Sequence, residues 1–102
     1  MITRTVDNLS PNELELFKEW VLTLLHNDKA DNLTITFRKS DGTDREMKGT
    51  LVPSAIPQDK VPTGNDHVDN ADVQRVFDVD LGEWRSFRWD RVKQVSFDLL
   101  PN

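Results

Sequence analysis

Apolar residues recur at helical spacing near the start of the chain and at strand spacing in the segments that follow. The helical segment carries its apolar side chains on one face, at Leu14, Phe17, Val21, Leu24 and Leu25. It is preceded by Ser10-Pro11-Asn12-Glu13, which supplies an N-cap serine, a proline at the first helical position and a capping-box glutamate. We predict an amphipathic helix within residues 9–27, whose apolar face must pack against another element.

Alternating apolar and polar residues predict strands in the rest of the chain. We predict five strands, at 33–38, 45–51, 73–79, 84–89 and 95–99, although neither face of 84–89 is cleanly apolar. The turn Ser40-Asp41-Gly42-Thr43 joins the first two as a hairpin. Gly49, inside the second strand, predicts a bulge or a sharp bend, because glycine in a strand often marks such a site.

Residues 53–71 have no periodicity and include three prolines, so we predict a long loop between strands. One helix and five short strands indicate a mainly β protein with one N-terminal α-helix. At 102 residues the chain has the length of a single domain. We therefore expect one domain over 1–102, in which the helix caps a small five-stranded β-barrel at 33–100.

Composition excludes several classes of protein. The chain has no cysteine, which rules out disulfides and thiolate metal sites. It has no apolar run of about 18 residues for a membrane span and no signal pattern at its start, so we expect a cytoplasmic protein without membrane contact. The net charge of -5 and the pI near 4.9 argue against tight binding to duplex DNA.

The segment 84–92 combines three aromatic residues with three arginines and has two interpretations. As a binding surface, Trp84, Arg85, Arg88 and Arg91 would stack on and clamp single-stranded nucleic acid. As a structural strand, Phe87 and Trp89 would be core residues. The arginines would then pair with nearby carboxylates, at Asp78, Asp80, Glu83 and Asp90.

Acidic residues cluster in and after the predicted helix, at Glu13, Glu15, Glu19, Asp28 and Asp31. They form either an ordinary solvated face or a docking surface for a basic protein. Under the second interpretation Glu15 and Glu19 contribute charge. Trp20, displaced from the apolar stripe, would be the aromatic anchor.

No known catalytic motif is present, so we predict no enzymatic activity, no catalytic residues and no cofactor. Asp78 and Asp80 are expected to be solubilising charges at a hairpin edge. His67, with Asp66, Asp69 and Asp72, does not match an established metal-binding loop, so a solvated acidic loop is expected there and no metal site. His26 is an isolated histidine near the helix end, where its charge would suit the helix dipole.

Several segments resemble a known family. They are 36–43 (TFRKSDGT), 47–51 (MKGTL), 76–78 (VFD) and 84–92 (WRSFRWDRV). Together they are similar to the small, phage-associated branch of WYL-like proteins over residues 33–97. The resemblance implies an SH3-like or Sm-like β-barrel. The chain departs from larger WYL domains because it lacks tyrosine, a Trp-Tyr-Leu triplet and a helix-turn-helix, so their sensing site is not carried over.

These observations lead to three functional hypotheses. The first is a non-catalytic phage accessory protein that binds and regulates a host or phage protein, in the host cytoplasm. The second is a module that binds single-stranded nucleic acid. The third is a structural subunit of a phage assembly, since Sm-like barrels can self-associate through exposed edge strands.

Overall fold

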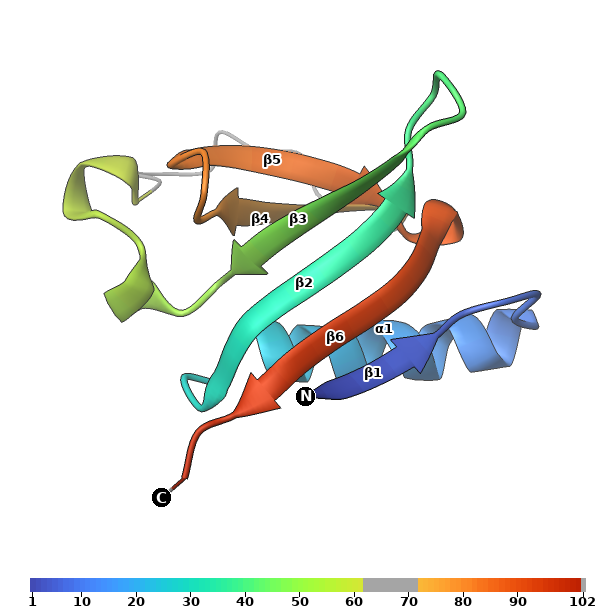
Figure 1. Cartoon of the computed structure of the whole chain (residues 1–102), viewed down its shortest axis with the longest axis horizontal. Coiled ribbons are helices and arrows are strands. Elements are labelled where there is room, and N and C mark those ends of the chain that lie inside the picture. The colour runs from blue at the N-terminus through green and yellow to red at the C-terminus, as the bar shows by residue number, and fades with distance from the viewer. Residues whose placement is uncertain (62–71, 102) are drawn as a thin grey trace.

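The protein forms a six-stranded sheet in which every strand is antiparallel to its neighbours. In the computed structural model, residues 1–61 and 72–101 are described. The strand order is β1-β6-β2-β3-β4-β5, and Figure 1 shows the helix α1 behind the β1, β6 and β2 end of the sheet. The strands are β1 (Ile2–Thr5), β2 (Ala30–Arg38), β3 (Asp44–Thr50), β4 (Val73–Asp78), β5 (Glu83–Arg88) and β6 (Val92–Leu99).

The prediction of five strands was wrong because β1 was missed. All four residues of β1 are exposed, so the strand lacks the buried alternation from which a strand is recognised in a sequence. It forms only because β6 offers an open edge, with Ile2 opposite Phe97 and Thr5 opposite Gln94. Strand β1 could therefore not be predicted from its own residues, because it depends on pairing with β6.

The sheet curls without closing into the expected barrel, since β1 and β5 are its two ends and are not paired with each other. Strands β3 and β4 share only the pairs Gly49–Asp78 and Thr50–Phe77. A Cβ atom at Gly49 would lie 2.9 Å from Val76 Cγ2. Gly49 therefore lets β4 approach β3 closely, while the bulge or bend expected at this residue stays a prediction.

Helix α1 (Pro11–Leu25) is shorter than the predicted range of 9–27 because its caps lie at Ser10 and His26. The predicted capping box is present. The Ser10 hydroxyl accepts a hydrogen bond from Glu13 N–H, and the Glu13 carboxylate accepts one from Ser10 N–H. His26 ends the helix, with its Nδ1 2.9 Å from the carbonyl of Leu22. The predicted amphipathic face is confirmed, since Phe17, Val21, Leu24 and Leu25 are buried.

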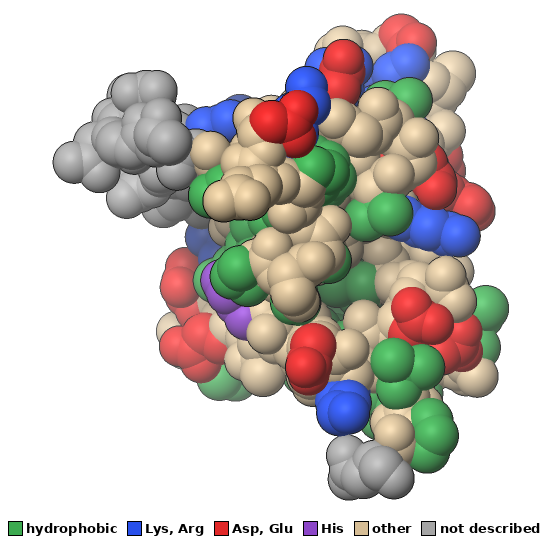
Figure 2. Space-filling view, turned by 90° about the vertical axis from the view of Figure 1, so that its left-hand side faces the viewer, with side chains coloured by type: hydrophobic (Ala, Val, Ile, Leu, Met, Phe, Trp, Pro, Cys, Tyr) green, Lys and Arg blue, Asp and Glu red, His purple; other side chains and the backbone are tan. Residues whose placement is uncertain are grey.

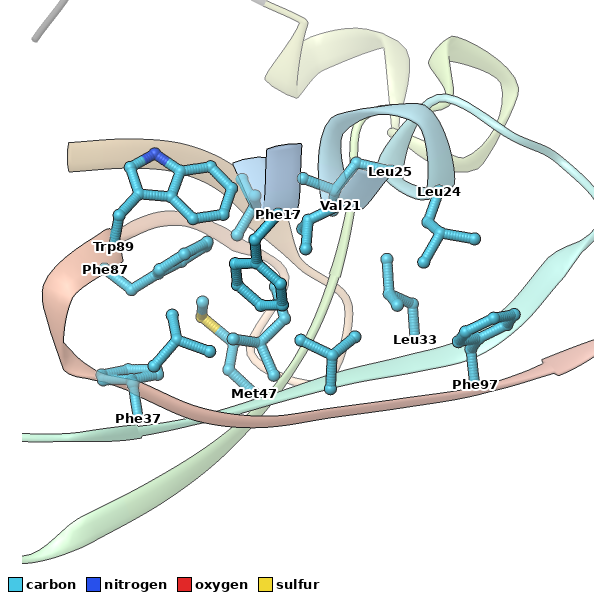
Figure 3. Packing of buried hydrophobic residues seen from close by; sticks show 14 residues of the cluster. Phe17, Val21, Leu24, Leu25, Leu33, Phe37, Met47, Phe87, Trp89 and Phe97 are labelled. Atoms are coloured by element: carbon cyan, nitrogen blue, oxygen red, sulfur yellow. The ribbon is translucent and has the colours of Figure 1, made fainter. Parts of the chain in front are cut away.

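The buried side chains of α1 pack against the curled sheet (Figure 3). The Phe17 ring meets the Trp89 ring edge-on at a centroid distance of 6.3 Å, and Trp89 directly follows β5. On the other side, the Arg4 guanidinium of β1 lies 5.4 Å from the centroid of Phe17 and 5.0 Å from that of Trp20. The helix thus makes core contacts with β1 and with the 3₁₀ turn Trp89–Arg91 that joins β5 to β6.

Several predicted segments needed adjustment. Strand β2 starts at Ala30 rather than residue 33, and a register shift surrounds Asn32, whose φ is 52°. Strand β6 starts at Val92 rather than residue 95. The predicted loop 53–71 begins with two single-turn 3₁₀ helices, at Pro53–Ala55 and Gln58–Lys60. Residues 62–71, which include His67, Asp66 and Asp69, lie outside the described residues.

Candidate functional site

Trp84 on β5 is held within the structure instead of being presented to solvent as a stacking platform. Its ring packs edge-on against Phe77 at a centroid distance of 5.8 Å, and its Nε1–H donates to the carbonyl of Lys60 at 2.7 Å. The guanidinium of Arg75 covers the ring at 5.3 Å. These contacts use the stacking surface and the donor with which Trp84 would bind a base.

The arginines of the segment are largely compensated by carboxylates two residues away. Arg85 forms an ion pair with Glu83 at 2.7 Å. Arg88 donates to both carboxylate oxygens of Asp90, at 3.1 and 3.2 Å. This hydrogen bonding raises the pKa of Arg88 and lowers the pKa of Asp90 from their ordinary values. Arg91 is exposed, and its charge also lowers the pKa of Asp90.

The structural interpretation of this segment therefore holds at most positions. Phe87 and Trp89 are buried at 3% and 4% exposure, and their rings meet edge-on at 5.0 Å. Two of the four expected carboxylates, Glu83 and Asp90, pair with its arginines.

Asp78 is not the solubilising surface charge that the sequence suggested. It is 1% exposed, and its Oδ2 receives a hydrogen bond of 2.7 Å from Arg45. Its Oδ1 accepts from the N–H groups of Asp80 and Leu81, at 3.1 and 3.0 Å. The carboxylate thus fixes the turn between β4 and β5 and links it to β3, which is a structural role.

The outer face of α1 carries the two predicted acidic residues in exposed positions. Glu15 pairs with Lys18 at 3.4 Å, while Glu19 lies one turn further along the helix. Figure 2 shows acidic side chains on the same face of the molecule as His26, drawn in purple. Leu16 is 67% exposed between these two glutamates.

Trp20 does not stand out from this face as an anchor. Its ring lies 6.0 Å from Phe17 and 5.9 Å from Phe97 by centroid, and Arg4 covers it. The side chain is half-buried and packs against the core. The exposed apolar residue of the helix is Leu16. Its exposure could not be predicted from the sequence, because a position off the apolar stripe does not show how much of a side chain contacts solvent.

A cleft of about 320 Å³ opens beside the C-terminal end of α1, and a hollow is visible on this face in Figure 2. Apolar groups such as Leu24, Leu33 and Val52 line it together with Asp28 and Lys48. No sequence signal marked this cleft, because its walls come from segments that are distant in the chain.

Within residues 1–61 and 72–101, no group of histidine and acidic side chains is arranged to hold a metal ion. In the same part of the chain, no helix has the length and apolar character needed to cross a membrane.

The chain is similar to a known protein family and to a phage protein. A family model described as "WYL_2, Sm-like SH3 beta-barrel fold" matches residues 23–93. A protein of Enterobacteria phage T4, the "Uncharacterized 11.5 kDa protein in Gp31-cd intergenic region", is 41% identical over 64 residues. The alignment covers 61% of this chain and 63% of the phage protein, so less than two thirds of that relative is matched. No solved structure matches.

Proposed function

The chain belongs to the WYL-like family with an Sm-like SH3 β-barrel fold, and from this membership we propose a non-catalytic accessory protein of a phage that binds and modulates a host or phage protein. The similarity to a phage T4 protein supports the phage setting. The host cytoplasm is then the place of action. The binding surface that we propose is the outer face of α1, defined by Leu16, Glu15 and Glu19.

The exposure of Leu16 is the observation that carries this proposal. A leucine that is 67% exposed in the middle of a helix gains no stability from burial in the monomer, whereas a partner that covers it would remove apolar surface from water. Trp20, which is half-buried, lies on the next turn of the helix and packs against the core. Leu16 replaces Trp20 as the central contact of the proposed interface.

The charge around Leu16 indicates the chemistry of the partner. Glu15 and Glu19 are exposed beside it, and residues 1–32 contain six acidic and three basic side chains. Such a field attracts a basic surface and repels an acidic one, which affects the rate of association and the choice of partner. We therefore expect a basic protein surface with a shallow apolar recess for Leu16.

Single-stranded nucleic acid binding has less support. The stacking face of Trp84 is covered by Arg75, and the charges of Arg85 and Arg88 are balanced by Glu83 and Asp90. Since binding to nucleic acid depends on cations that neutralise phosphates, we expect no measurable affinity for short single-stranded DNA or RNA at low salt. Fluorescence anisotropy with labelled oligonucleotides measures this directly. Salt-dependent binding that an Arg85→Glu/Arg88→Glu variant abolishes would instead support a function in binding single-stranded nucleic acid.

The proposed surface is tested by photo-crosslinking in infected cells. A photoreactive amino acid at position 16 should crosslink to one basic protein, which mass spectrometry identifies. The matched control places the same probe at Glu46, which is exposed on β3. The crosslink at position 16 should be lost in a Glu15→Lys/Glu19→Lys background. Equal crosslinking from positions 16 and 46, or none from position 16, would contradict the proposal.

A further inference from the structure

The sheet opens between β2 and β3 near the C-terminal end of α1 (Figure 1). The ladder between these two strands ends at the pair Thr34–Lys48. Beyond that pair, the start of β2 lies beside β6, while the end of β3 pairs with β4. The cleft of about 320 Å³ lies where the strands separate, because residues 30–33 and 48–50 both line it.

The walls of the cleft suit the aliphatic part of one long side chain. Leu24 and Leu33 are buried core residues, and half-buried Val52 adds to the apolar wall. Pockets that enclose a whole small molecule measure roughly 300–1,000 Å³, so this open cleft is at the lower limit. Long cationic side chains bury their methylene groups on apolar surface and keep the charged group at a polar rim.

The charge around the cleft favours a cation. Helix α1 ends here, and no basic residue in its last turn offsets the negative end of the helix dipole. Asp28 and Asp31 also line the cleft. Within residues 1–61 and 72–101, neither carboxylate forms an ion pair, so both can accept a cation from outside the chain.

Lys48 is the one basic residue among the described residues that line the cleft. It lies opposite Thr34 in the ladder, so its side chain is on the face of the sheet opposite to buried Leu33. Its ammonium group is therefore directed away from the apolar wall. The two carboxylates and the helix end outweigh this single positive charge.

We propose that this cleft binds an arginine side chain of the basic partner protein. The methylene groups of the arginine would lie against Leu24 and Leu33, and its guanidinium would lie beside Asp28 and Asp31. Arginine fits better than lysine because its guanidinium is more weakly hydrated and its planar donors match a carboxylate.

This inference rests on the proposed function, since the arginine belongs to the basic protein that would cover Leu16. Leu24 lies just over two turns after Leu16, about 12 Å along the helix axis. An interface of ordinary size, about 800 Å² on each partner, spans both contacts. The cleft and the outer face of α1 are therefore two parts of one binding surface.

NMR titration with a short arginine peptide tests the chemistry of the cleft. The probe is the tripeptide glycyl-arginyl-glycine with blocked ends, and the control peptide carries citrulline, which has nearly the same shape but no charge. The arginine peptide should shift the amide signals of Leu33, Val52 and Ala55, which line the cleft. It should bind about fivefold more tightly than the citrulline peptide, and added salt should weaken its binding. Equal affinities, shifts confined to residues outside the cleft, or no shifts at all would overturn the proposal.

A double variant identifies the carboxylates that hold the guanidinium. Asp28→Asn/Asp31→Asn should bind the arginine peptide about fivefold more weakly and leave the affinity for the citrulline peptide unchanged. The matched control Asp7→Asn/Glu46→Gln removes the same number of charges at exposed positions outside the cleft and should bind like the natural chain. Equal weakening in both double variants would overturn the assignment to the cleft.

The titration does not involve Leu16, so its outcome is separable from that of photo-crosslinking. A crosslink from position 16 without arginine binding in the cleft would leave the proposed function intact and overturn the cleft alone. Arginine binding in the cleft without a crosslink from position 16 would support the cleft and contradict the surface around Leu16.

Discussion

At the scale of single residues, Asp78 shows how much of a side chain's role depends on neighbours that a sequence does not reveal. In the chain it stands two positions from Asp80, as one of two similar acidic residues near a turn. In the structure it is 1% exposed and bonded to Arg45, while Asp80 is exposed. The difference arises because Arg45 comes from a strand 33 residues earlier.

Replacement of Asp78 with alanine should destabilise the protein by about 3 kcal/mol, since it leaves Arg45 and two turn N–H groups without their acceptor. The matched control, Asp80→Ala, removes an exposed carboxylate and should change stability by less than about 0.5 kcal/mol. Chemical denaturation followed by tryptophan fluorescence measures both. Similar effects for the two variants would show that Asp78 does not hold the turn.

The capping glutamate of α1 should make stability depend on pH. The hydrogen bonds from Ser10 lower the pKa of Glu13 from its ordinary value of 4.5. Its contribution to stability is therefore fully present above the unfolded pKa and is lost as pH falls through the lower folded pKa.

This pH dependence is measured by comparing the natural chain with Glu13→Gln. The natural chain should be the more stable at neutral pH, and its advantage should shrink below about pH 4.5. An exposed control, Glu46→Gln, separates the capping effect from the general loss of a charge. An advantage that stays constant from neutral to acidic pH would exclude the capping carboxylate as its source.

At the scale of elements, local signals allowed α1 and five of the strands to be predicted, while β1 and the open sheet were not predictable in the same way. Helix α1 has its own capping residues and its own apolar stripe, so the sequence alone specifies it. Strand β1 has neither and depends on the free edge of β6. Closure was expected from strand number and length, but pairing of the sheet ends depends on the whole path of the chain.

Gly49 lies where β4 closely approaches β3, and a side chain there should be poorly tolerated. In Gly49→Ala the new Cβ would lie 2.9 Å from Val76 Cγ2, on a β-branched residue that cannot easily turn away. We expect a loss of about 1–3 kcal/mol in thermal or chemical unfolding.

A double variant, Gly49→Ala/Val76→Ala, provides the control for this contact. Val76→Ala alone destabilises because it leaves a cavity, but in the double variant the new methyl group has room. The combined loss should therefore be smaller than the sum of the two single losses. Simple additivity would mean that the side chains at positions 49 and 76 do not compete for the same space.

At the scale of the whole molecule, helix α1 packs its inner face against the curled sheet and leaves its outer face exposed. Its inner face contacts Trp89 after β5 and Arg4 on β1, while its outer face presents Leu16 and two glutamates. The sequence allowed the acidic face to be predicted from the charges of residues 1–32. It did not allow the choice between Leu16 and Trp20, because Phe97 and Arg4, which cover Trp20, come from distant positions.

The aromatic–arginine segment illustrates the same limit at the level of function. Its composition suggests nucleic-acid binding, whereas its stacking surface and most of its charge are used within the protein. These contacts could not be predicted from composition, because Arg75 and the Lys60 carbonyl reach Trp84 only in the folded chain.

Native-state hydrogen exchange tests whether α1 is a structural part of the curled sheet. We expect the amides of Val21 and Leu25 in α1 to exchange only by global unfolding, with the same free energy of opening as Ile35 in β2 and Val95 in β6. Rapid exchange in α1 beside a sheet that remains protected would contradict it.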